Sequence, residues 1–151
     1  MTIAIELHNL SREFTAGTEV IRAVDAIDMT VARGEFIAVA GPSGSGKSTL
    51  LYMIGGLEKP TAGTVRVDGA DLAAMTDPQK ARYRGEKIGF VFQEFNLMNH
   101  LKAIENVQLP LMLAGVAPRR RAARARSALA SVGLDRRADR VADAQGDEVL
   151  G

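Results

Sequence analysis

The glycine-rich segment from Gly41 to Ser48 constrains the fold of this chain more than any other feature. Its sequence, GPSGSGKS, matches G-x-x-x-x-G-K-[ST] at every fixed position. It follows an apolar run, Phe36 to Ala40, which predicts a strand buried on both faces as in a parallel sheet. It precedes Leu50 and Ile54, which stand at helical spacing. This order of strand, glycine loop and helix predicts an α/β fold with a phosphate-binding loop.

The residue types of this loop suit the phosphates of a nucleoside triphosphate. Glycine permits backbone conformations and close approaches that a Cβ would block, so successive amides can point at phosphate oxygens. The Lys47 ammonium would meet the β- and γ-phosphates, and the Ser48 hydroxyl suits a Mg²⁺ ion held between them. The predicted nucleotide-binding residues are Gly41, Ser43, Gly44, Ser45, Gly46, Lys47, Ser48 and Thr49.

Three other interpretations of the glycine-rich segment fit its sequence less well. It could be an ordinary strand-to-helix turn with an incidental lysine, which the flanking pattern disfavours. A dinucleotide fingerprint, G-x-G-x-x-G, fails because Thr49 stands where the third glycine belongs. A nucleophile elbow, G-x-S-x-G, fails because Ser45 follows Gly44 where its last glycine belongs.

Hydrophobic periodicity predicts the remaining elements. Alternation predicts strands over residues 3–8, 27–32, 64–67 and 88–92, with a tight turn at 68–69. Helices are predicted over 47–57, over 77–84 with Asp77 as N-cap and Gly85 as its end, over 106–115 with a break or start near Pro110, and over 118–132. Ala122, Ala125, Leu129 and Val132 form the expected packing stripe of the last helix.

Composition excludes several classes of protein. The chain of 151 residues has room for one modest domain, and no apolar run reaches the eighteen residues of a membrane span. No basic segment leads into an apolar core at its start, so no secretory signal is expected. The absence of cysteine excludes disulfides and thiolate metal sites and agrees with a reducing cytoplasm.

The stretch from residue 118 to 140 carries eight arginines against two aspartates. Such a cluster can mark nucleic-acid binding. No aromatic residue lies among the arginines, however, and the apolar stripe of the last helix still supplies a packing face, so a solvated helix face is favoured. No nucleic-acid partner is therefore predicted.

Several segments resemble the ATP-binding subunit of ABC transporters. They read GPSGSGKST at 41–49, GTVRVDG at 63–69 and IGFVFQ at 88–93. NLMNHL at 96–101, ENV at 105–107 and LAG at 113–115 are similar to the subgroup that drives lipoprotein release or macrolide export. The resemblance implies an α/β, P-loop NTPase fold with an N-terminal antiparallel β portion, ATP and Mg²⁺ as cofactors, and a cytoplasmic position at the inner face of the membrane.

Two further site residues follow from the resemblance. Phe14 matches the aromatic residue that stacks on adenine, although it could instead be a core aromatic. Gln93 matches the glutamine whose side-chain oxygen reaches the metal or the attacking water, although it could simply be a polar residue that ends a strand. Lys47 and Gln93 are thus the catalytic residues that the chain would contribute, and Ser48 and Gln93 its metal ligands.

The resemblance also implies two protein partners. The segment from Glu94 to Ala103 looks like the surface that receives a short helix of the membrane permease. Phe95, Leu97, Met98 and Leu101 would then be exposed, whereas a satellite of the core would bury them. The second implied partner is another ATP-binding subunit, which forms a dimer with the first in the complete protein.

The chain departs from the family pattern after Leu134. Four later elements that the family uses for hydrolysis are not found: a Leu-Ser-Gly-Gly-Gln signature, an apolar strand ending in Asp-Glu, an aspartate loop and a switch histidine. We therefore assign residues 1–134 to the N-terminal part of the domain and 135–151 to a tail outside the family pattern. A kinase or GTPase would need other downstream motifs, and none is visible.

Two functions remain open at this point. The chain is expected to be the ATP-binding subunit of an ABC transporter that powers a permease. The alternative is a truncated or frame-shifted fragment that binds nucleotide without hydrolysing it, and the sequence does not decide whether the chain is itself an ATPase.

Overall fold

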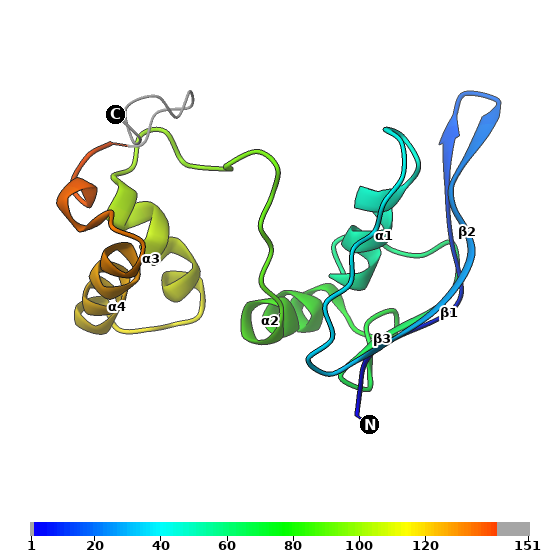
Figure 1. Cartoon of the computed structure of the whole chain (residues 1–151), viewed down its shortest axis with the longest axis horizontal. Helices are drawn as coiled ribbons and strands as arrows, with labels where there is room; N and C mark the ends of the chain where they lie inside the picture. Colours follow the sequence, from blue (N-terminus) through cyan, green and yellow to red (C-terminus); the bar gives the residue numbers. More distant parts are fainter. Residues whose placement is uncertain (1, 142–151) are drawn as a thin grey trace. The chain divides into compact units, whose positions relative to one another are not determined.

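The computed structural model describes residues 2–141 and divides the chain into two units, with the boundary after Arg84 (Figure 1). The first unit contains β1 (Ile3–Ala16), β2 (Glu19–Ala32), α1 (Lys47–Ile54), β3 (Ala62–Val67), β4 (Ala70–Asp71) and most of α2 (Asp77–Lys87). The second unit contains α3 (Ala103–Leu113), α4 (Pro118–Ser131) and the short 3₁₀ helix η1 (Asp135–Arg137).

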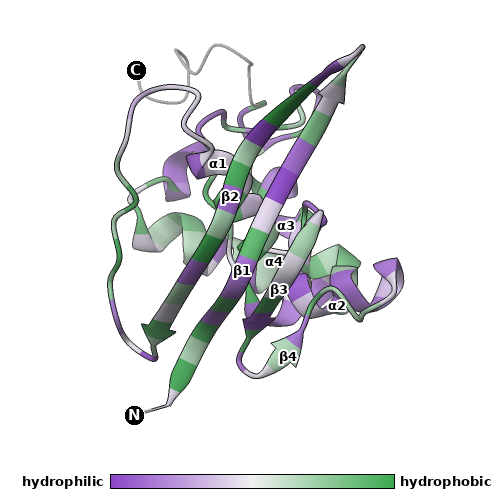
Figure 2. Cartoon of the chain, turned by 90° about the vertical axis from the view of Figure 1, so that its right-hand side faces the viewer, coloured by the Kyte–Doolittle hydropathy of each residue, from purple (hydrophilic) through white to green (hydrophobic). Residues whose placement is uncertain are grey.

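The first unit is built on an antiparallel sheet with strand order β2-β1-β3-β4. β1 and β2 form a long hairpin in which Leu7 pairs with Met29 and Phe14 with Ile21. Apolar and polar residues alternate along these strands, as Figure 2 shows by hydropathy. The N-terminal antiparallel portion is therefore confirmed, and its two strands are longer than predicted.

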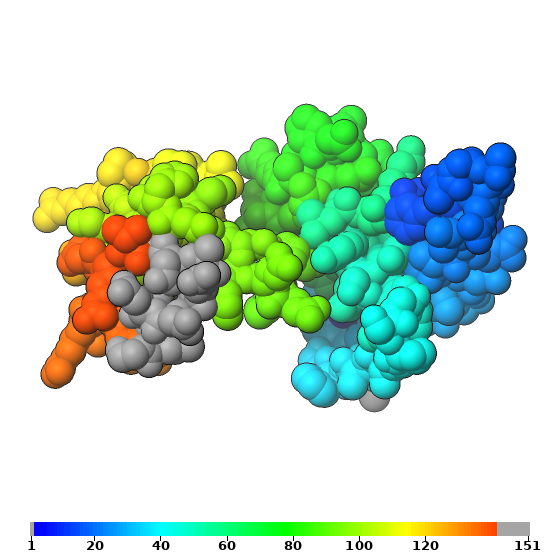
Figure 3. Space-filling view, turned by 90° about the horizontal axis from the view of Figure 1, so that it is seen from above, coloured from blue at the N-terminus to red at the C-terminus, as the bar shows by residue number. Residues whose placement is uncertain are grey.

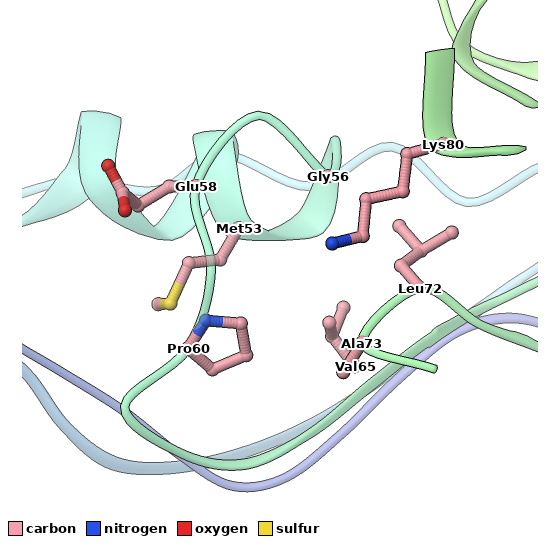
Figure 4. A pocket seen from close by; sticks show the side chains of 8 residues that line it. All are labelled: Met53, Gly56, Glu58, Pro60, Val65, Leu72, Ala73 and Lys80. Atoms are coloured by element: carbon pink, nitrogen blue, oxygen red, sulfur yellow. The ribbon is translucent and has the colours of Figure 1, made fainter. Parts of the chain in front are cut away.

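α1 packs on this sheet and closes the first hydrophobic core. Leu7, Leu10, Met53 and Val65 are at most 1% exposed, and Leu50 and Leu72 are also buried. A small cavity remains between α1, β3 and the segment that follows β4, with the Lys80 side chain along one wall (Figure 4). The Tyr83 hydroxyl donates to the Val67 carbonyl at 2.7 Å, and its burial, with a smaller effect of Asp68, raises the pKa of Tyr83. α2 is thereby tied to the sheet.

Two predicted strands, over 36–40 and 88–92, are irregular segments outside any sheet. Phe36 is 93% exposed, so the prediction of a strand buried on both faces was wrong for 36–40 in the described structure. The alternating segment 88–92, in which Val91 is fully exposed, is not a strand there either. The physical reason is that a strand satisfies its backbone groups through neighbouring strands. Within residues 2–141, no strand pairs with either segment.

The helix boundaries differ from the predicted ones in α1, α2 and α3. α1 ends at Ile54, before the predicted end at residue 57. α2 begins after Thr76, whose carbonyl accepts the Lys80 amide at 2.9 Å, and it continues through Gly85. Asp77 is therefore in the first turn rather than at the N-cap. α3 begins at Ala103 and accommodates Pro110 in its interior.

The second unit has a small core between α3 and α4. Ile104, Ala125, Leu129 and Ala138 are buried, whereas Val132 is 68% exposed and does not belong to the packing stripe. The residues after η1 return to the start of α3, because the Ile104 amide donates to the Ala138 carbonyl at 2.9 Å. The exposed arginines of α4 are Arg119, Arg120, Arg124 and Arg126, which agrees with a solvated face.

Part of the predicted tail, 142–151, lies outside the described residues. Among the described residues, no helix combines the length and the apolar character that a membrane crossing requires.

Gly63 at the start of β3 provides a test of this packing. Its φ is +81°, and a Cβ there would lie 2.2 Å from the Asn9 carbonyl oxygen. Gly17, in the hairpin turn, also has positive φ (+63°) but open space around it. Gly63→Ala should lower the free energy of unfolding by about 2–5 kcal/mol, since the left-handed conformation and the overpacking both contribute. Gly17→Ala should cost only about 1–2 kcal/mol.

Urea denaturation of the two variants measures this difference. Equal losses would mean that the β1–β3 contact is looser than the structure shows.

Candidate functional site

The glycine loop leads into α1 and presses against β2. Gly46 is the N-cap of α1 with φ +85°, and the Leu50 amide donates to its carbonyl at 2.9 Å. A Cβ on Gly46 would lie 1.9 Å from the Ala23 carbonyl oxygen of β2. Only glycine fits this combination of conformation and contact. The sheet thus fixes where the loop enters the helix.

Lys47 folds back over the loop that precedes it. Its Nζ donates to the carbonyl oxygens of Gly41 at 2.9 Å and Pro42 at 2.7 Å, with the Ser45 Oγ at 3.4 Å. The Ser45 amide closes the loop further by donating to the Pro42 carbonyl at 3.4 Å. The ammonium is therefore held at the mouth of the helix by groups that an anionic ligand can replace.

The start of α1 is electropositive. The first amides of a helix have no partner within the helix, and the aligned peptide dipoles add positive potential there. The first turn of α1 contains no acidic residue that would cancel this potential. Ser43, Ser45 and Ser48 are exposed, and Thr49 is half-buried, so three hydroxyls of the loop are accessible. This end of α1 can bind an anion such as a phosphate.

Phe14 lies on β1 outside the buried core. It is 36% exposed and pairs with Ile21, two residues along β2 from the Ala23 carbonyl that contacts the loop. The Arg12 guanidinium lies over its ring, with Cζ 4.4 Å from the ring centroid. The first unit therefore carries the loop and the predicted aromatic residue on adjoining elements.

An ion pair that the sequence analysis missed holds Arg12. Its Nη2 lies 2.8 Å from the Glu58 Oε1 in the turn that follows α1. The two residues are far apart in the sequence, and no spacing rule connects a strand residue with a loop residue at such a separation. Only the folded structure reveals the pair.

Gln93 and the predicted partner segment belong to the second unit. Gln93 is exposed, and its role beside Ser48 stays a prediction. Phe95, Leu97 and Met98 are 72%, 40% and 50% exposed, as predicted for an interaction surface, whereas Leu101 is half-buried. Three of the four apolar side chains are therefore available to a partner.

Asn106, in the first turns of α3, fixes this segment. Its Oδ1 accepts the Met98 amide at 2.9 Å, and its Nδ2 donates to the carbonyls of Met98 at 3.2 Å and Leu101 at 3.3 Å. One amide side chain thus adds to the backbone bond in which the Leu101 amide donates to the Met98 carbonyl at 2.9 Å. The sequence shows Asn106 only as part of the ENV segment, without this function.

Within residues 2–141, no group of three or more histidine, cysteine, aspartate or glutamate side chains is arranged to hold a metal ion. Mg²⁺ commonly uses one or two protein ligands together with substrate phosphates and water. The Ser48 hydroxyl, exposed at the start of α1, can be such a ligand.

Comparison with known proteins identifies relatives that match most of the chain. MacB from Salmonella typhimurium, a macrolide export ATP-binding/permease protein, is 42% identical over 139 residues, which cover 92% of this chain and 22% of MacB. YknY from Bacillus subtilis, an uncharacterized ABC transporter ATP-binding protein, is 42% identical over 130 residues, 86% of this chain and 56% of YknY. The chain thus spans about a fifth of MacB and about half of YknY.

The fold has solved relatives as well. The ATP-binding cassette MJ0796, in a dimeric post-hydrolysis state bound to ADP and Pi, matches with a TM-score of 0.84 and 39% identity. The match covers 91% of this chain and 61% of that one. The family model described as ABC transporter matches residues 24–150. The glycine loop, the antiparallel sheet and these matches agree, and the chain belongs to the ABC transporter family.

Proposed function

We propose that this chain binds Mg-ATP through the loop from Gly41 to Thr49 and forms the ATP-binding part of a transporter. The observation that carries the proposal is the position of Lys47: its ammonium is held at the positive end of α1 by loop carbonyls, and Gly46 fixes that loop against β2. The ADP and Pi bound to the related cassette MJ0796 support the assignment.

Different residues of the first unit bind different parts of the nucleotide. Lys47 and the amides at the start of α1 bind the phosphates, which carry most of the ligand's charge. Phe14 supplies a flat face on which adenine stacks. The Ser48 hydroxyl ligates Mg²⁺, and the ion, when bound, neutralises charge on the phosphate oxygens. Gln93 belongs to the second unit, and its role toward the metal or the attacking water is proposed from the family resemblance alone.

The partner of the second unit is a membrane permease. Phe95, Leu97 and Met98 form an exposed apolar group beside α3, which Asn106 holds in one conformation. Such a group suits the apolar face of a short helix. The chain would then act at the cytoplasmic face of the membrane, together with a second ATP-binding subunit, because the relatives include a permease-fused protein and a dimeric cassette.

A titration of the whole chain with ATP tests the nucleotide assignment. At a concentration of ATP about 100 times its Kd, the free energy of unfolding should rise by about 2.7 kcal/mol. Absence of any shift with ATP, with or without Mg²⁺, would contradict the proposal.

Ser48→Ala tests the metal assignment in the same titration. We expect the variant to bind ATP about tenfold more weakly in Mg²⁺, as expected for loss of a polar metal ligand worth about 1.4 kcal/mol. Its affinity in EDTA should match that of the unchanged chain. Ser127→Ala, an exposed serine of α4, is the matched control. An equal loss in EDTA would mean that Ser48 acts on the phosphates and not through Mg²⁺.

A further inference from the structure

The ring of Phe14 is not free on both faces. The Arg12 guanidinium lies over one face, with Cζ 4.4 Å from the ring centroid, which is within the range of a cation–π interaction. The ring is also 36% exposed, so part of it remains accessible to a ligand. One side of Phe14 is therefore covered by its own chain while another part faces solvent.

Arg12 is itself fixed in place. Its side chain is 24% exposed and that of Glu58 is 30% exposed, and their charged groups meet at 2.8 Å. The Nε of Arg12 is buried and makes no hydrogen bond within the described structure. A buried donor without a hydrogen bond is unfavourable, so other contacts must hold the Arg12 side chain over the ring. The ion pair with Glu58 supplies that contact.

Glu58 connects this arrangement to the loop-bearing helix. The amides of Leu57 and Glu58 donate to the Tyr52 carbonyl of α1, at 2.8 Å and 3.1 Å. The segment after Glu58 is also bound to β1, because the Thr61 amide donates to the Ser11 carbonyl at 2.9 Å and the Thr61 hydroxyl accepts the Glu13 amide at 3.0 Å. Figure 4 shows Glu58 at the opposite end of the cavity from Lys80. The segment that carries Glu58 is therefore bound both to α1 and to β1, and it holds the Arg12 side chain through the ion pair.

We infer that Arg12 and Glu58 are positioning residues for the base of the nucleotide. By fixing the Phe14 ring on one side, they leave a pre-ordered apolar surface for one planar heteroaromatic base. A ring that is already ordered loses less side-chain freedom when the ligand stacks on it, which strengthens binding. This inference rests on the proposed function, since it assigns the base end of the site whose phosphate end is the Lys47 loop.

The two ends of the ligand can be tested separately in the full chain. Inorganic tripolyphosphate with Mg²⁺ reports on the loop alone, and Mg-ATP reports on the loop and the base together. Arg12→Ala should weaken Mg-ATP about three- to tenfold, the range expected for ordering one side chain on binding. Its affinity for tripolyphosphate should not change. Glu58→Gln, which removes the charge that holds Arg12, should shift ATP affinity in the same direction by a smaller factor.

Coupling to Phe14 distinguishes positioning from a general effect on the fold. In a Phe14→Ala background, Arg12→Ala should cause no further loss of ATP affinity, because the ring that Arg12 positions is gone. Arg12→Lys, which keeps a cation beside Glu58, should restore part of the affinity. Arg22→Ala is the matched control, since Arg22 pairs with Glu13 and Asp25, whereas the cation–π contact in the part of the chain that the structure describes is made by Arg12.

The outcomes separate the inference from the proposed function. If neither Mg-ATP nor tripolyphosphate binds, the proposed function fails. If both bind through Lys47 but Arg12→Ala leaves the ratio of the two affinities unchanged, the positioning role is overturned. Tighter ATP binding by Arg12→Ala would overturn it too, since Arg12 would then occupy the face that the base needs. If Arg12→Ala does not fold, the ratio of the Mg-ATP and tripolyphosphate affinities is measured for Glu58→Gln instead. An unchanged ratio in that variant would overturn the positioning role.

Discussion

Lys47→Ala is expected to weaken Mg-ATP binding at least about tenfold and up to about a hundredfold. Hydrogen bonds to charged groups contribute about 1.5–3 kcal/mol each, and every 1.4 kcal/mol corresponds to a factor of ten in affinity. The ammonium is the one charged side chain that the structure holds inside the glycine loop, by bonds to Gly41 and Pro42. Isothermal titration of both chains measures the loss.

The same change should alter stability little. The loop carbonyls that accept from Lys47 belong to exposed residues, so water can replace the ammonium once it is gone. Lys59→Ala, at an exposed lysine outside the loop, is the control for loss of a positive charge. If ATP raised the thermal midpoints of the chain and of Lys47→Ala by equal amounts, the assignment of the loop would be wrong.

The sequence predicts best those structural features that depend only on residues close together in the chain. The proline that opens α4 and the positive-φ glycine that follows α4 mark helix ends through the conformational limits of single residues. The β1–β2 hairpin was predicted only in part, because the alternation indicates strands over 3–8 and 27–32 but not the two-residue turn at 17–18 through which the longer strands pair. Helix ends that a single residue sets need no distant partner, and the sequence therefore predicts them well.

Distant partners explain what the sequence did not predict. The run at 36–40 has the apolar pattern of a buried strand and 88–92 has the alternation of a strand, but a strand also needs neighbours, and none of the described strands pairs with either segment. The pair of Arg12 and Glu58 depends on how the turn after α1 returns to β1. Asn106 is comparable, because its bonds to Met98 and Leu101 follow from a loop conformation that no motif specifies.

Gly46→Ala should affect both binding and folding. At φ +85° an alanine loses about 1–2 kcal/mol, and its Cβ would lie 1.9 Å from the Ala23 carbonyl oxygen, an overpacking that adds about 1–3 kcal/mol. β2 is held by its pairing with β1, including Arg12 with Val24, whereas the loop belongs to no sheet. The loop is therefore the part that moves, and its amides lose their alignment toward the phosphates.

Gly44→Ala separates the two causes. Gly44 has nearly the same φ, +78°, but nothing lies within 4 Å of the Cβ position, so only the conformational cost of about 1–2 kcal/mol applies. We expect Gly44→Ala to keep ATP binding within about tenfold of the unchanged chain, and Gly46→Ala to lose about a hundredfold or more, the equivalent of about 2.8 kcal/mol. Denaturation and titration of both variants measure the two effects. If the two variants lost ATP affinity equally, backbone freedom within the loop would determine binding. If only Gly46→Ala lost affinity, the contact with β2 would determine binding, because that contact sets where the loop presents its amides and Lys47.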